Sequence, residues 1–99
     1  MLNITKNANG SNLTIGLEGR LDTTTAPELE GEVKELLPEV TDLVLDLEKL
    51  EYISSAGLRV LLSTQKVMNT KGTMLVKNSR EELKEIFKVT GFADILTIE

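Results

Sequence analysis

Apolar and polar positions alternate along the first part of the chain, which is the pattern of half-buried β-strands. Leu2 and Ile4 begin the alternation, and Leu13, Ile15 and Leu17 resume it after a polar stretch at residues 7–10. The Asn-Gly pair at positions 9–10 readily takes positive φ, although the loop looks longer than two residues. This segment therefore predicts a β-hairpin.

From residue 26 the apolar spacing changes to three and four residues, which indicates an amphipathic helix. Residues 19–25 are the predicted connection, and Thr25 and Glu28 have the spacing of a capping box with Pro27 in the first turn. Pro38 closes the helix. The predicted buried face consists of Ala26, Leu29, Val33, Leu36 and Leu37.

The middle of the chain joins the most apolar strand to the most apolar helix. A nearly continuous apolar run around residues 43–47 is typical of a strand buried on both faces. A helix is expected from about Ala56 to Thr70, ended by Lys71 and Gly72. Its predicted core face consists of Leu58, Leu61, Leu62 and Met68.

The last third repeats the strand and helix pattern on a smaller scale. Residues 74–76 predict a short strand, and Ser79 and Glu82 have the spacing of a second capping box. A third helix buries Leu83, Ile86 and Phe87, and Gly91 is placed as its C-terminal cap. Leu96 and Ile98 are expected to add a terminal strand.

The order β-β-α-β-α-β-α-β predicts a single α/β domain over residues 1–99, with a mixed β-sheet and about three to four helices. Strands separated by a helix are expected to pair in parallel. A chain of 99 residues is long enough for one small domain with its own core.

Composition excludes several kinds of chemistry. The chain has no cysteine and no histidine, so disulfides, zinc sites with sulfur or imidazole ligands and histidine-assisted nucleophiles are absent. Asp22 and Asp46 have no metal-ligand cluster beside them in the sequence. We expect no enzyme activity, no catalytic or metal site and no cofactor.

The charge and the hydrophobic runs limit the partners. A net charge of −5 disfavours nucleic acid. No apolar run approaches the roughly 20 residues needed to span a bilayer. We expect a cytoplasmic protein with no direct membrane contact.

The hinge between the central strand and helix carries two serines, Ser54 and Ser55. At a helix N-terminus a serine either caps the backbone or marks a place for an anion, and both interpretations are open. Arg59 could pair with a partner's acid or remain solvated. Val60, Ser63, Thr64 and Val67 lie off the core face and suit either a docking surface or a neighbouring helix.

Two stretches carry a resemblance to a known family: Glu-Gly-Arg-Leu-Asp at 18–22, and Tyr-Ile-Ser-Ser-Ala-Gly-Leu-Arg-Val-Leu at 52–61 after Asp46 and Leu47. Together they resemble a STAS domain of the bacterial anti-sigma-factor antagonist type, and the resemblance covers essentially the whole chain. The family's usual motif is Asp-Ser-Ser/Thr-Gly, with its first serine phosphorylated. Aligned on the glycine, Ser55 stands at the phosphoserine, and Ser54, at the aspartate position, is the second choice.

The resemblance implies an antagonist that binds an anti-sigma factor, itself a serine kinase, until serine phosphorylation ends the interaction. A PP2C-like phosphatase is the expected further partner. The alternative is a STAS interaction module in another complex, such as a phosphatase-linked partner switch or a membrane transport system. The expected partner-binding residues are Asp22, Ser54, Ser55, Ala56, Gly57, Arg59, Val60 and Ser63.

Overall fold

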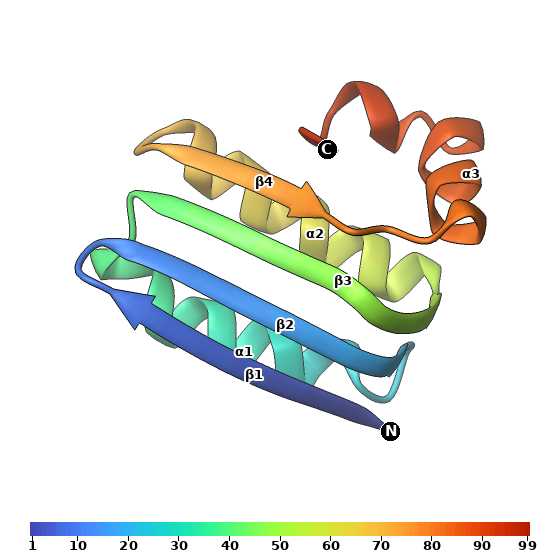
Figure 1. Ribbon diagram of the computed structural model, residues 1–99, viewed down its shortest axis with the longest axis horizontal. Coiled ribbons are helices and arrows are strands. Elements are labelled where there is room, and N and C mark those ends of the chain that lie inside the picture. Colours follow the sequence, from blue (N-terminus) through green and yellow to red (C-terminus); the bar gives the residue numbers. More distant parts are fainter.

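In the computed structural model, which describes residues 1–99, four strands form one mixed sheet in the order β1-β2-β3-β4 (Figure 1). The strands are β1 (Leu2–Asn9), β2 (Asn12–Leu21), β3 (Asp42–Ile53) and β4 (Thr73–Lys77). β1 is antiparallel to β2, whereas β2, β3 and β4 are parallel to one another. The predicted α/β domain with a mixed sheet is confirmed.

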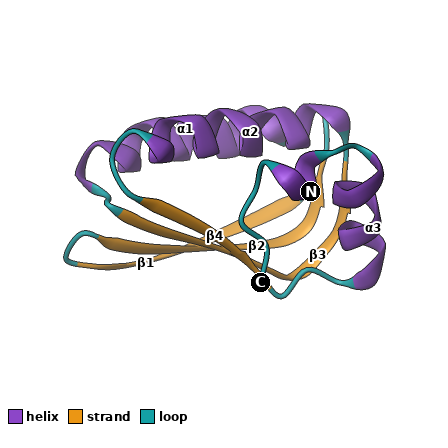
Figure 2. Cartoon of the chain, turned by 90° about the horizontal axis from the view of Figure 1, so that it is seen from above, coloured by secondary structure: helices purple, strands orange, loops and turns teal.

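Two helices, α1 (Ala26–Leu36) and α2 (Ser55–Asn69), lie side by side on one face of the sheet (Figure 2). The third, α3 (Glu81–Val89), lies beyond the end of β4. A short 3-10 turn at Leu37–Glu39 continues the first helix, and another at Phe92–Asp94 follows the third helix after Gly91. None of the helices combines the length and apolar character needed to cross a membrane.

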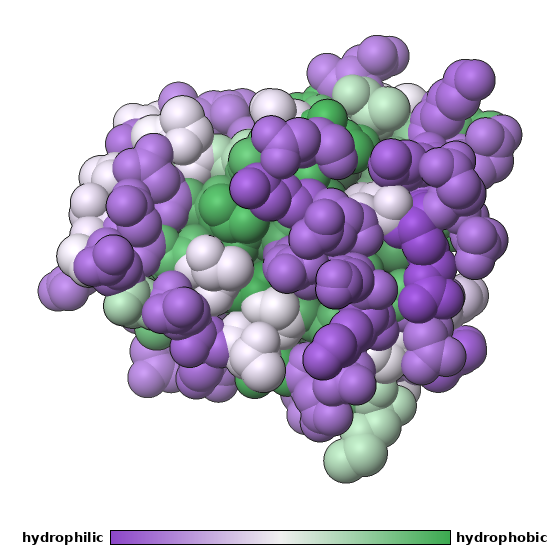
Figure 3. All heavy atoms as spheres, in the orientation of Figure 1, coloured by the Kyte–Doolittle hydropathy of each residue, from purple (hydrophilic) through white to green (hydrophobic).

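The core lies between the sheet and the helix pair. Leu45 of β3, Leu61 of α2 and Val33 of α1 belong to the same buried cluster, as their spacing predicts. The opposite sheet face is open and mostly hydrophilic, with a small apolar area (Figure 3). On that face Val44 and Leu75 are only half-buried, so the expectation that the strand around residues 43–47 is buried on both faces is wrong. Helix packing on one face alone explains the alternating burial along β2 and β3.

The strands are longer than the sequence predicts. β3 continues to Ile53 because Leu50 and Ile53 remain buried beyond the polar residues at 48–49. β2 continues to Leu21, so the connection before α1 starts after Leu21 and not at Gly19. Gly19 instead sits at an irregularity in the β2–β3 register with a φ of 105°. The hairpin loop, which looked longer, contains only Gly10 and Ser11.

Neither predicted capping box forms. The Thr25 hydroxyl is 2.8 Å from the Arg20 carbonyl, to which it donates, and does not cap α1. At the start of α3 the N-cap position is Arg80, one residue after Ser79. Ser79 is buried and its hydroxyl has no hydrogen-bond partner. Thr25 does occupy the predicted N-cap position of α1, but its hydroxyl bonds to the preceding turn, whereas Ser79 lies one residue before the N-cap of α3.

The predicted terminal strand is reduced to a single parallel bridge between Val76 and Ile98. The Val76 N–H donates to the Thr97 carbonyl and the Glu99 N–H donates to the Val76 carbonyl, each at 2.9 Å. Gly91 has a φ of 82° directly after α3, so its predicted role as a C-terminal cap is confirmed. The chain end is thus held to the outer edge of β4 without extending the sheet.

Candidate functional site

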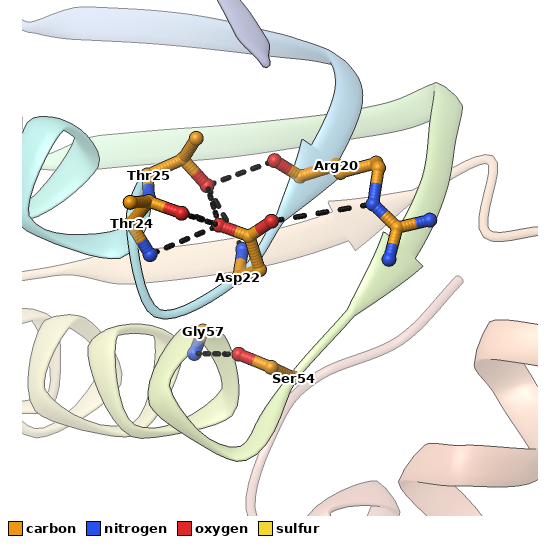
Figure 4. A network of polar contacts seen from close by, with 6 residues as sticks. All are labelled: Arg20, Asp22, Thr24, Thr25, Ser54 and Gly57. Atoms are coloured by element: carbon orange, nitrogen blue, oxygen red, sulfur yellow. Dashed lines mark hydrogen bonds and ion pairs between the residues drawn. The ribbon is translucent and has the colours of Figure 1, made fainter.

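Two loops meet at the carboxyl ends of β2 and β3. Leu21 and Ile53 are register partners in the parallel pair, and the next N–H, that of Ser54, donates to the Leu21 carbonyl at 2.8 Å. The loop after β2 begins with Asp22, and the loop after β3 leads directly into α2. The sheet therefore brings Asp22 and Ser54 together although 31 positions separate them (Figure 4).

The two serines of the hinge have different positions. Ser54 is the N-cap of α2: its backbone is extended and its hydroxyl accepts from the Gly57 N–H at 3.3 Å. Ser55 is the first residue of the helix and is exposed. The capping interpretation therefore holds for Ser54, and the Ser55 hydroxyl is left accessible at the positive end of the helix dipole.

Asp22 organises the loop opposite this hinge. Its Oδ1 accepts from the Thr24 hydroxyl at 2.9 Å and from the Thr24 and Thr25 N–H groups at 3.0 and 3.1 Å. These donors, the Thr24 hydroxyl first and then the Thr25 N–H, hold the pKa of Asp22 below its ordinary value. Asp22 is therefore an ionised residue at neutral pH that organises the turn beside the hinge.

Arg20 and Tyr52 form a second feature at this end of the sheet, and sequence reasoning assigned neither of them to the site. They are register partners on β2 and β3, and the Arg20 guanidinium lies 4.2 Å from the centroid of the Tyr52 ring. Arg20 Nε is also 4.0 Å from Asp22 Oδ2. Only the strand register, a tertiary property, reveals this contact between residues far apart in sequence.

Gly57 lets α2 approach the strand ends closely. A Cβ on Gly57 would lie 2.7 Å from Leu21 Cγ and 2.9 Å from Ile53 Cγ1, which are closer than normal contacts. Gly57 is itself buried and Ala56 is half-buried, so both support the exposed surface around Ser55 and contribute little to it directly. The predicted site residue Gly57 thus positions the hinge against the sheet.

We expect Gly57→Ala to lower the free energy of unfolding by about 1–3 kcal/mol, because the methyl group overpacks this contact. Gly31, in the middle of α1, is the matched control because a Cβ there meets nothing within 4 Å. Gly31→Ala should stabilise the protein by about 0.5–1 kcal/mol through helix propensity alone. Urea denaturation of both variants checks this, and equal effects of the two substitutions would contradict the assigned role of Gly57.

The remaining predicted residues lie along α2, where this helix faces α1. Arg59 and Ser63 are exposed, whereas Val60 is buried at 7% exposure. All three line a hollow of about 240 Å³ that also includes Thr23, from the loop before α1, and Pro27, from its first turn. Val60 and Thr64 are buried, as packing against a neighbouring helix predicts, whereas the docking role of their exposed neighbours stays a prediction.

The arrangement offers a surface and an accessible hydroxyl. No group of three or more His, Cys, Asp or Glu side chains is placed to hold a metal ion. Asp46 accepts from the Glu48 N–H at 3.0 Å and the Asn78 amide at 3.1 Å, which are structural contacts on β3. The site brings together the side chains of two loops and two helices at one end of the sheet.

The sequence matches the STAS domain family over residues 3–99. It is 30% identical over 98 residues to the anti-sigma-B factor antagonist of Bacillus subtilis (strain 168), covering 98% of this chain and 90% of that protein. An anti-sigma factor antagonist from Mycobacterium paratuberculosis has the same fold, with a TM-score of 0.90, 20% identity and coverage of 99% and 85% of the two chains.

The Bacillus cell fate determinant SpoIIAA, solved in its phosphorylated form, superimposes with a TM-score of 0.76 and 16% identity, over 100% of this chain and 91% of that chain. At these identities the two solved structures establish the fold. The predicted STAS-like fold is confirmed, because the family match and the superpositions agree over nearly the whole chain.

Proposed function

The chain belongs to the STAS domain family, with anti-sigma factor antagonists among its relatives, and we propose that it binds an anti-sigma factor that is also a serine kinase. Phosphorylation of Ser55 ends this binding, and a PP2C-like phosphatase restores it. In this proposal the domain itself has no catalytic role and operates in the cytoplasm with its partners.

The exposed Ser55 at the first position of α2 is the observation that carries the proposal. A kinase needs a hydroxyl that it can reach, and Ser54 is already engaged as the cap through its contact with Gly57. The relatives support the partner, since the B. subtilis protein is named for antagonising an anti-sigma factor. SpoIIAA, with the same fold, has been solved phosphorylated.

The electrostatics of the hinge explain how a phosphate could act without unfolding the domain. A phosphate adds about −1.5 to −2 charge at pH 7, and at a helix N-terminus the dipole and free N–H groups stabilise it. The ionised Asp22 of the adjacent loop adds negative charge to the same end of the sheet. A partner surface that accepts the neutral serine would face a dianion without a matching cation.

The proposal is tested by incubating the protein with the anti-sigma factor of the same organism and ATP, and mapping the phosphate by mass spectrometry. We expect a single phosphate on Ser55, none in Ser55→Ala, and normal phosphorylation of Ser54→Ala. Titration calorimetry should show that Ser55→Ala still binds. A phosphate found on Ser54 alone, or no binding by the unmodified protein, would contradict the proposal.

A further inference from the structure

A continuous groove runs between α1 and α2, starting at the candidate site. The hollow of about 240 Å³ beside Arg59 is followed by a second hollow of about 300 Å³ towards the C-terminal ends of the two helices. Both hollows are lined by Glu30, Val60 and Ser63, so they form one depression, which we call the helix groove. The groove leads away from Ser55 along the helix pair.

The far half of the helix groove is lined by apolar side chains. Val33 and Leu37 of the α1 segment, together with Val60 of α2, form its buried lining. Val67 completes it, and 45% of Val67 is exposed although its side chain is entirely apolar. Nearly half of the surface of this valine is therefore open to solvent. An apolar hollow continuous with a binding site is a common feature of surfaces that receive a partner's side chains.

The same half of the groove carries a net positive charge, because its two lysines outnumber its one carboxylate, that of Glu30. Lys34 and Lys71 both line it, and neither forms an ion pair within the chain. The Lys71 ammonium donates to the Leu37 carbonyl, which fixes it beside the end of α1. In a protein with a net charge of −5, these two cations mark a place where a carboxylate is favoured.

We propose that the helix groove receives one face of an amphipathic helix of the anti-sigma factor. The helix places apolar side chains against Val67 and a carboxylate at the end marked by Lys34 and Lys71. From Ala56 to Val67 the groove follows α2 for about 16 Å, at about 1.5 Å per residue, which matches about three turns of a partner helix. This inference rests on the proposed function, because the groove is continuous with the surface beside Ser55.

The test compares Val67→Glu with Val89→Glu in titrations of the anti-sigma factor. Val67 is 45% exposed near the end of α2, so a glutamate there can reach solvent and the fold should persist. Val89, on α3, is 71% exposed and outside the groove, so Val89→Glu makes the same chemical change elsewhere. We expect Val67→Glu to weaken binding by at least about tenfold and Val89→Glu to leave it within about twofold.

A second pair tests the charge: Lys34→Glu, in the groove, against Lys84→Glu, which is exposed on α3. We expect only Lys34→Glu to weaken binding, with a smaller loss at high salt because screening weakens both attraction and repulsion. Circular dichroism melts show whether each variant is folded. Ser55→Asp is measured in parallel as the reference for the proposed function.

The outcomes distinguish a failure of the helix-groove inference from a failure of the proposed function. If Ser55→Asp blocks binding while Val67→Glu and Lys34→Glu bind like the parent, the helix groove is not used and the proposed function stands. If the unmodified protein does not bind the anti-sigma factor, both fail. Dodecanoate, a small amphiphilic anion, is titrated as a probe while the amide NMR resonances around Val67 are followed. If it shifts these resonances and neither groove variant affects anti-sigma factor binding, the groove binds a small amphiphilic anion and the inference is wrong.

Discussion

Ser55→Asp is expected to bind the anti-sigma factor at least about 100-fold more weakly than the parent while unfolding at nearly the same denaturant concentration. A penalty of about 3 kcal/mol is enough for that change in affinity. It arises because a carboxylate at position 55 must lose its hydration at the interface without a matching cation. The fold tolerates the substitution because the acid sits in the first turn of α2, where the helix dipole favours negative charge.

Ser11→Asp is the matched control, because it changes the net charge equally. Ser11 is exposed in the hairpin loop, at the opposite end of the sheet from the hinge. The Ser11→Asp variant should bind the anti-sigma factor with the affinity of the parent if position 55, and not total charge, decides that affinity. Calorimetric titrations at two salt concentrations measure both variants. Equal affinities for Ser55→Asp and the parent would show that Ser55 is not the switch residue.

Leu61→Ala should lower the free energy of unfolding by about 2–5 kcal/mol, the range for deleting a buried leucine and leaving a cavity. Leu61 is 1% exposed and belongs to the same buried cluster as Leu45 and Val33. The surroundings cannot collapse easily, because the sheet lies on one side of the cluster and α1 on the other. Such a loss is a large share of the stability of a small domain.

Leu62→Ala is the control on the same helix. Leu62 is only half-buried and does not belong to the core cluster, so its truncation should cost clearly less than that of Leu61. Urea denaturation of both variants gives the two free energies of unfolding, fitted with one common dependence of that free energy on urea concentration. An unchanged midpoint for Leu61→Ala would contradict the assignment of this helix face to the core.

The sequence predicted the element order through α3 and most of the core because both depend on local periodicity, whereas Leu62, predicted on the core face, lies outside the core cluster. The alternation at Leu13, Ile15 and Leu17 and the helical spacing from Leu58 to Met68 each need only a neighbouring apolar surface to become buried. For the same reason the hinge at Ser54 and Ser55 was recognised as a helix start. The family resemblance came from the same stretch of residues, and the family match confirms it.

Details that depend on distant segments were predicted less well. The spacing placed Thr25 correctly at the N-cap of α1, but the turn held by Asp22 engages its hydroxyl. Ser79 was predicted as a cap, but it follows the left-handed Asn78, with a φ of 60°, and the N-cap of α3 is Arg80. The terminal strand became a single bridge, because only residue 98 registers against Val76. Local patterns do not specify where a turn directs a side chain.

The sequence by itself determined that one small α/β domain forms and that a pair of serines begins its central helix. Only the tertiary structure decided which serine caps, since Ser54 follows the register partner of Leu21 and turns its hydroxyl to Gly57. It also brought Asp22 and Arg20 to the same end of the sheet and opened the helix groove beside Val60. Strand register and helix packing join residues far apart in the chain, and no local pattern encodes those distances.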